Sequence, residues 1–209
     1  MPAVCSILQN SVNPCKSVSN EKQCKSVSGK IVTIFGTSNA KDGDEVFNLA
    51  FELGRLCALA GFTIANGGYG GTMLAAAKGA KQSGGKTVGI TCSAFGRKGP
   101  NEFITENIVT ENLTKRVAKL IEIGDAYIVL PGSTGTLLEL AEIWERTNKG
   151  FVNPPKPIIL LTDFFRPLLE IIAAFDKNSL EFITIAGTPA QVVEILLAAM
   201  SRRSGKERI

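Results

Sequence analysis

The sequence predicts a doubly wound α/β domain, in which helices cover both faces of a parallel sheet. From residue 30 onwards, short runs rich in β-branched and other apolar residues alternate with longer amphipathic segments, as expected for strands buried on both faces. The 209 residues, 44% hydrophobic and 20% charged, suffice for one domain with its own core. We therefore expect a single Rossmann-like domain over residues 30–201.

Each predicted element has the period or the composition of its type. Residues 31–35 form an apolar, β-branched run that ends at Gly36, and residues 46–57 follow with apolar side chains at helical spacing. The alternation continues with strands at 62–65, 87–91, 126–130 and 157–161, and helices at 72–82, 110–123, 137–147, 164–175 and 189–201. Ligands of such sheets bind beyond the carboxyl ends of the strands, in the loops that lead into helices.

The two ends of the chain depart from this pattern. Residues 1–29 are polar, contain two near-repeats that begin at Cys15 and Cys24, and have no helical or strand period, so we expect a flexible N-terminal extension. Residues 202–209 carry four basic residues and one acidic residue, and we expect them to form a basic C-terminal tail.

Charge and hydropathy limit the possible partners. The net charge of +4 comes from the chain ends, since 15 basic and 17 acidic residues remain between residues 31 and 201. We therefore expect no nucleic-acid partner. No stretch approaches the roughly 20 apolar residues of a membrane span, and the N-terminus lacks the apolar run of a signal peptide, so we expect a cytoplasmic protein without membrane contact.

The chemistry is limited by the absence of histidine. Ser-His-Asp and Cys-His nucleophiles and histidine-based zinc sites are excluded. The five cysteines form no CxxC pair, which favours reduced thiols. The carboxylates show no metal-ligand spacing, so we expect neither metal nor cofactor. Catalysis would then depend on carboxylates, lysines, arginines, hydroxyls, thiols or backbone dipoles.

Three predicted strand-to-helix loops are rich in glycine or hydroxyl residues, which lets backbone N–H groups approach an anion at a helix N-terminus. Each alone could be a tight turn, but three at one edge of the sheet favour a phosphate or nucleotide site. Neither GxGxxG nor a Walker loop occurs at the required position. The residues assigned to this site are Gly36, Ser38, Gly67, Gly68, Gly70, Gly71, Thr72, Met73, Gly132, Ser133, Thr134, Gly135 and Thr136.

Charged residues beside these loops are candidates for chemistry, each with a structural alternative. Glu139 follows the third loop as a candidate catalytic carboxylate, but Thr136-x-x-Glu139 is also a capping box. Arg116 borders the apolar stripe of the predicted helix 110–123, where it could bind an anionic ligand or form a structural ion pair. Glu142 is a secondary candidate at helical spacing from Glu139, with an exposed pair to Arg146 as the alternative.

Together the second loop, NGGYGGTM (66–73), the third, PGSTGTLLE (131–139), and Arg116, 15 residues before Pro131, resemble the LONELY GUY (LOG) family. These are cytokinin riboside 5′-monophosphate phosphoribohydrolases, sometimes mislabelled lysine decarboxylases. The family patterns are GGGxxGxM and PGGxGTxxE, and the resemblance covers residues 31 to about 200. The chain departs from them at Asn66 and Ser133, and at Val117 where a basic residue is usual.

The resemblance implies hydrolysis of the N-glycosidic bond of a nucleoside 5′-monophosphate to a free base and ribose 5-phosphate. Glu139 would stabilise the ribose cation and activate water, and loop N–H groups would bind the phosphate. Arg116 would bind phosphate or assist the departing base. The resemblance also implies a homodimer with helices near the third loop at the interface. The alternative is a non-catalytic nucleotide or molybdenum-cofactor carrier of the same fold.

Overall fold

The computed structural model describes residues 29–206. The predicted N-terminal extension, apart from Gly29, and the last three residues of the predicted tail lie outside this range. The described elements are β1 (Ile31–Phe35), α2 (Glu45–Leu59), β2 (Thr63–Asn66), α3 (Thr72–Gln82), β3 (Thr87–Cys92), the 3-10 helix η1 (Ser93–Phe95), β4 (Glu106–Thr110), α4 (Leu113–Ile123), β5 (Ala126–Val129), α5 (Thr134–Asn148), β6 (Ile158–Leu161), α6 (Arg166–Ala173), the 3-10 helix η2 (Asn178–Phe182), β7 (Ile183–Ala186) and α7 (Pro189–Lys206).

The strands form one parallel sheet in the order β4-β3-β2-β1-β5-β6-β7. The strand order reverses between β1 and β5, where Val32 pairs with Ala126 and Phe35 with Val129. In a doubly wound sheet the connections leave to opposite faces at such a point, so a crevice opens beyond the carboxyl ends of these two strands. The predicted fold class is confirmed.

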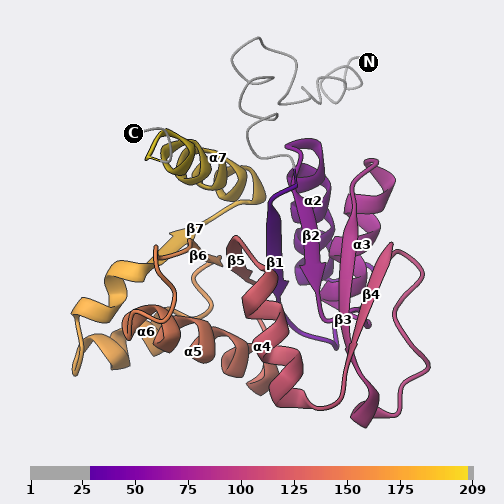
Figure 1. Ribbon diagram of the computed structural model, residues 1–209, viewed down its shortest axis with the longest axis horizontal. Helices are drawn as coiled ribbons and strands as arrows, with labels where there is room; N and C mark the ends of the chain where they lie inside the picture. Colours follow the sequence, from indigo (N-terminus) through magenta and orange to yellow (C-terminus); the bar gives the residue numbers. More distant parts are fainter. Residues whose placement is uncertain (1–28, 207–209) are drawn as a thin grey trace, which may run out of the picture.

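Two apolar layers hold the helices on the sheet. Side chains of alternate strand residues, such as Val32 and Ile34 of β1, pack with α2, α3 and α7 on one face. The other layer contains Tyr127 and Val129 of β5 and packs with α4, α5 and α6. Figure 1 shows α4, α5 and α6 together on one side of the sheet and α2 and α7 on the other. Because both faces are covered, the central strands are almost entirely buried, which explains why they consist mainly of apolar and β-branched residues.

The two edge strands, β4 and β7, were not predicted. In β4 (ENIVT) most side chains are exposed, and β7 (ITIA) is fully buried only at Ala186. Edge strands need no continuous apolar run, because one side of each lacks a neighbouring strand. The helix predicted from residue 110 begins at Leu113 instead, after Asn112, whose side chain accepts a hydrogen bond from the Lys115 N–H. The last helix continues five residues beyond its predicted end at Ser201.

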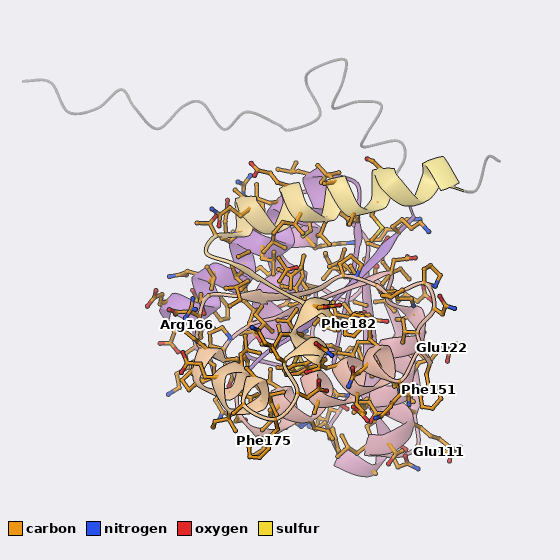
Figure 2. The ribbon with its side chains drawn as sticks, turned by 90° about the vertical axis from the view of Figure 1, so that its left-hand side faces the viewer. Glu111, Glu122, Phe151, Arg166, Phe175 and Phe182 are labelled. Carbon is orange, nitrogen blue, oxygen red and sulfur yellow. The ribbon has the colours of Figure 1, made fainter. Side chains whose placement is uncertain are left out.

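The apolar residues of α5 divide between core and surface. Leu140, Ile143 and Trp144 are buried in the core of the chain, while Leu137 is 38% exposed. The most exposed aromatic side chains are Phe175, at 93%, and Phe151, at 81%. Both are labelled in Figure 2. Of the helices that the structure describes, none is long and apolar enough to cross a membrane.

Candidate active site

A cleft of about 270 Å³ opens at the carboxyl edge of the sheet, at the reversal of strand order. The segments that follow β1 to β5 supply its walls, four of them leading into α-helices and the one after β3 leading to β4. The lining residues all lie between Gly36 and Glu139. The volume is close to the lower end of small-ligand pockets, about 300 Å³. The lining residues are Gly36, Thr37, Ser38, Tyr69, Met73, Phe95, Arg97, Leu113, Arg116, Ser133, Gly135, Thr136 and Glu139.

Arg116 of α4 lines the cleft and is held by hydrogen bonds to backbone carbonyls. Its side chain is 8% exposed, Nε donates a hydrogen bond to the Ile90 carbonyl (2.8 Å), and Nη2 donates to the Gly67 carbonyl (3.2 Å). Burial lowers the pKa of Arg116, and the nearby Glu139 carboxylate opposes this effect. With Nε and Nη2 engaged, Nη1 is the group that Arg116 directs towards Glu139, at 4.0 Å from Oε1.

Glu139 lies on the second turn of α5 and does not cap it. The helix begins at Thr134 with Ser133 as its N-cap, so Thr136 is inside the first turn and the capping-box alternative is wrong. The Glu139 side chain is 13% exposed. Burial raises its pKa from the ordinary 4.5 to about 7, although Arg116 lowers it in part. A carboxyl group that titrates near neutral pH can exchange protons with substrate and water.

The N-terminus of α5 forms the polar wall. The first N–H groups of a helix have no partner within it, and the Ser133 side chain makes no capping hydrogen bond. Gly135 and Thr136 both line the cleft, and Thr136 is 3% exposed. An added Cβ at Gly132 would overlap the Thr136 hydroxyl, so the loop needs a glycine there. The arrangement suits an anion such as phosphate.

The second loop leads into α3, whose N-terminus is covered by the first loop. The Thr72 N–H and hydroxyl both donate to the Thr37 carbonyl (2.9 and 3.0 Å), so the first loop covers the N-terminus of α3. Gly71 has a φ of 65° and packs against this carbonyl, where a side chain would not fit. An added Cβ at Gly67 would overlap the Arg116 guanidinium. These contacts fix Arg116 and the first loop.

Asn66 ties the second loop together. Its side chain donates to the Met73 carbonyl (3.0 Å) and accepts from the Gly68 N–H (2.8 Å), and it is fully buried. Val117, another position that departs from the motif, is 5% exposed and packs in the core beneath α4. Both departures therefore have structural explanations that leave Arg116 and Glu139 in place.

Aromatic and cationic side chains form another part of the cleft lining. Tyr69 is 6% exposed, and its hydroxyl accepts from the Cys92 N–H (2.8 Å) and donates to the Cys92 carbonyl (3.2 Å). The Arg97 guanidinium lies over the Tyr69 ring, with Cζ 4.6 Å from the ring centroid. Phe95 and Leu113 are 39% and 43% exposed and also line the cleft.

The structure brings about half of the predicted site residues to the cleft. Those that line it are Gly36, Ser38, Met73, Arg116, Ser133, Gly135, Thr136 and Glu139. Those outside the lining are Gly67, Gly68, Gly70, Gly71, Thr72, Gly132 and Thr134. Glu142 pairs with Arg146 (2.7 Å), which is the structural alternative we considered for it.

Tyr69, Phe95, Arg97 and Leu113 were not among the predicted site residues. Phe95 and Arg97 follow β3 at its carboxyl end, the edge at which the other loops meet. The only signal in the sequence for these two residues was their position directly after a strand. The loop was missed because it has no glycine-rich motif and no α-helix follows it.

Comparisons with known proteins identify the family to which this sequence is similar. A family model described as "SLOG cluster4 family" matches residues 29–193. A cytokinin riboside 5′-monophosphate phosphoribohydrolase of Rhodococcoides fascians is 34% identical over 148 residues, which are 68% of this chain and 74% of that protein. The corresponding LOG4 protein of Arabidopsis thaliana is 26% identical over 86% of each chain.

A solved structure is also similar to this chain. The molybdenum cofactor binding protein of Rippkaea orientalis superposes with a TM-score of 0.68 and 26% identity, over 82% of this chain and 97% of that one. Both an enzyme family and a binding protein therefore share this architecture.

Proposed function

Because the chain belongs to the SLOG cluster4 family, and so to the wider LOG family, we propose that it hydrolyses the N-glycosidic bond of a nucleoside 5′-monophosphate. The observation that carries the proposal is the buried pair of Glu139 and Arg116, 4.0 Å apart, beside an open helix N-terminus in one cleft. Water attacks C1′ of the ribose while the C1′–N bond breaks and its electron pair goes to the base. The proton that leaves the water ends on the base, so the products are the neutral free base and ribose 5-phosphate.

The 5′-phosphate binds at the N-terminus of α5. The N–H groups of Gly135 and Thr136 and the helix dipole favour a dianion there. We do not assign phosphate to α3, because the Thr37 carbonyl occupies the Thr72 N–H. Glu139 is four residues beyond Gly135, a rise of about 6 Å along the helix, and its side chain leans back towards the N-terminus. That separation is of the order of the distance from a 5′-phosphate to the glycosidic bond.

Glu139 acts as the carboxylate at the reaction centre. Positive charge builds on the ribose ring as the C1′–N bond breaks, and an anionic carboxylate at low local dielectric stabilises it. The same carboxylate accepts a proton from the attacking water. With a pKa of about 7, Glu139 is deprotonated in a large fraction of molecules at neutral pH and is still basic enough to accept that proton.

Arg116 acts mainly on Glu139. Its Nε and Nη2 groups donate to the Ile90 and Gly67 carbonyls. Arg116 therefore does not present a free Nε–Nη2 pair for bidentate hydrogen bonds to a phosphate. Its positive charge keeps the pKa of Glu139 from rising further. This supports an electrostatic role in orienting and partly ionising the carboxylate.

The second candidate function is non-catalytic binding of a nucleotide or the molybdenum cofactor, which the similarity to the Rippkaea orientalis protein favours. A carrier needs the loops but not a buried carboxyl group of perturbed pKa beside an arginine. Retention of both Glu139 and Arg116 therefore favours the enzyme.

The decisive experiment is an assay of free-base release from a panel of nucleoside 5′-monophosphates that includes AMP, isopentenyl-AMP and GMP. The matching nucleosides are the controls for the phosphate handle. Release from monophosphates only, abolished by Glu139→Gln, supports the proposal. No release from any monophosphate, with thermal stabilisation by one of them, supports the carrier.

A further inference from the structure

The Arg97 guanidinium lines the cleft beside Tyr69 and, among the residues that the structure describes, forms no salt bridge. We propose, on the basis of the function proposed above, that Arg97 is a specificity residue that binds the carbonyl edge of the leaving base and selects 6-oxopurine nucleotides, such as GMP and IMP, over AMP. The proposal depends on the opposite polarity of the two ends of the cleft.

The phosphate and base ends are assigned by this polarity. Helix N–H groups at the start of α5 suit an anion, and Glu139 lies further along the same helix, 4.0 Å from Arg116. On the other side of Arg116, its Cζ is 5.5 Å from the ring centroids of Tyr69 and Phe95, so the exposed apolar side chain of Phe95 lies beyond Glu139 as seen from the α5 N-terminus. Leu113, one turn before Arg116 on α4, adds a second exposed apolar side chain. Exposed apolar side chains inside a cleft suit the faces of a planar ring. With Glu139 between the two ends, a nucleotide whose phosphate lies on α5 extends its base towards Phe95, Leu113 and Arg97.

Tyr69 is a rigid support and does not offer its hydroxyl to a ligand. Its hydroxyl makes two hydrogen bonds to the backbone of Cys92, and its carbonyl accepts from the Asn101 side chain at 2.7 Å. Arg97 covers one face of the ring at 4.6 Å. The Tyr69 ring therefore positions the Arg97 guanidinium, and Arg97 is the residue that can donate hydrogen bonds to the base.

Arg97 retains donors for a ligand. It is exposed, and within the described part of the chain no carboxylate forms a salt bridge with it. A guanidinium that lies on an aromatic ring still presents paired N–H groups at its edge. Two such donors match two adjacent acceptors.

The 6-oxopurines carry such a pair, O6 and N7, on one edge, whereas adenine places a donor amino group beside N7. When the C1′–N bond breaks, its electron pair is delocalised over the purine, including these two atoms. Hydrogen bonds from a cation then become stronger in the transition state, which raises kcat as well as affinity. Adenine would meet the same donors with its amino group and gain less.

The test compares kcat/KM for GMP, IMP and AMP in the wild-type protein, Arg97→Ala, Arg97→Lys and Lys98→Ala. Lys98 is the matched control, since it is a neighbouring exposed cation that does not line the cleft. We expect the wild type to prefer GMP and IMP by about tenfold or more. Both Arg97 variants should lose most of this preference, because lysine lacks the paired fork, while Lys98→Ala should keep it.

Several results would overturn the inference. A wild-type preference for AMP, or an unchanged preference in Arg97→Ala with an unchanged melting temperature, excludes Arg97 as the specificity residue. A preference kept by Arg97→Lys shows that charge alone matters and removes the argument from paired donors. Hydrolysis of AMP without hydrolysis of GMP or IMP refutes only the base selectivity, whereas no hydrolysis of any nucleotide refutes the proposed function itself.

Discussion

Replacing Glu139 by glutamine should abolish turnover and yet make the folded protein more stable at alkaline pH. The pKa of Glu139 in the folded protein is about 7, above its ordinary 4.5. The folded state therefore binds this proton more tightly than the unfolded chain does. The stabilisation that the folded state gains from binding this proton is fully present below about pH 4.5 and is lost as the pH rises through about 7.

The size of the effect follows from the two pKa values of Glu139, 4.5 and about 7. At about 1.4 kcal/mol per pH unit, the charged carboxylate costs the folded state about 3 kcal/mol near pH 8, but less than about 1 kcal/mol near pH 5. Glutamine is neutral at both pH values and has nearly the same shape. For a domain of this size about 3 kcal/mol corresponds to a rise in melting temperature of about 6–12 °C.

The assay is thermal unfolding of the wild type and Glu139→Gln at both pH values, together with base release at neutral pH. Glu142→Gln is the matched control on the same helix, where an exposed pair with Arg146 contributes little. A gain in melting temperature that is equal at the two pH values would refute the argument from charge. A loss at both would show that Glu139 makes a structural contact.

Three further predictions follow from the site. The kcat/KM of the wild type should rise with pH, with a midpoint near 7, because the Glu139 carboxylate is the active form; a flat profile between about pH 5 and 9 would contradict this. Arg116→Met should move that midpoint to higher pH, because the Arg116 charge lowers the pKa of Glu139; an unchanged midpoint in the pH–rate profile would exclude the electrostatic role. Asn66→Gly should lower the free energy of unfolding by about 1–3 kcal/mol, because the hydrogen bonds to Met73 and Gly68 are lost, and denaturant titration at constant pH measures this change.

The fold could be predicted wherever burial dictates the sequence. The central strands had to be apolar because helices cover both faces, and the helices between them had to be amphipathic. Edge strands β4 and β7 escaped prediction because part of their surface faces solvent. The first turn of α5 escaped for a related reason: Gly135 and Thr136 line the cleft, and the turn 134–136 shows no apolar period.

The site was predictable only where motifs marked it. Arg116 and Glu139 were found from their spacing to a glycine loop, and the structure brings them within 4.0 Å. Arg97 and Phe95 were not, because their place in the cleft depends on how the segment after β3 folds against Tyr69. Such a contact joins residues far apart in the chain and leaves no local pattern. The structural role of Asn66 likewise could be recognised only from its side-chain hydrogen bonds to Met73 and Gly68.

The lining of the cleft stops at Glu139, before β6 begins. We therefore expect substitutions in the later strands and helices to change stability more than substrate choice. A fluorophore or an immobilisation handle placed beside the exposed Phe175 would report on the protein while leaving the chemistry undisturbed. The same separation makes the earlier portion the natural target for libraries that seek new base specificity.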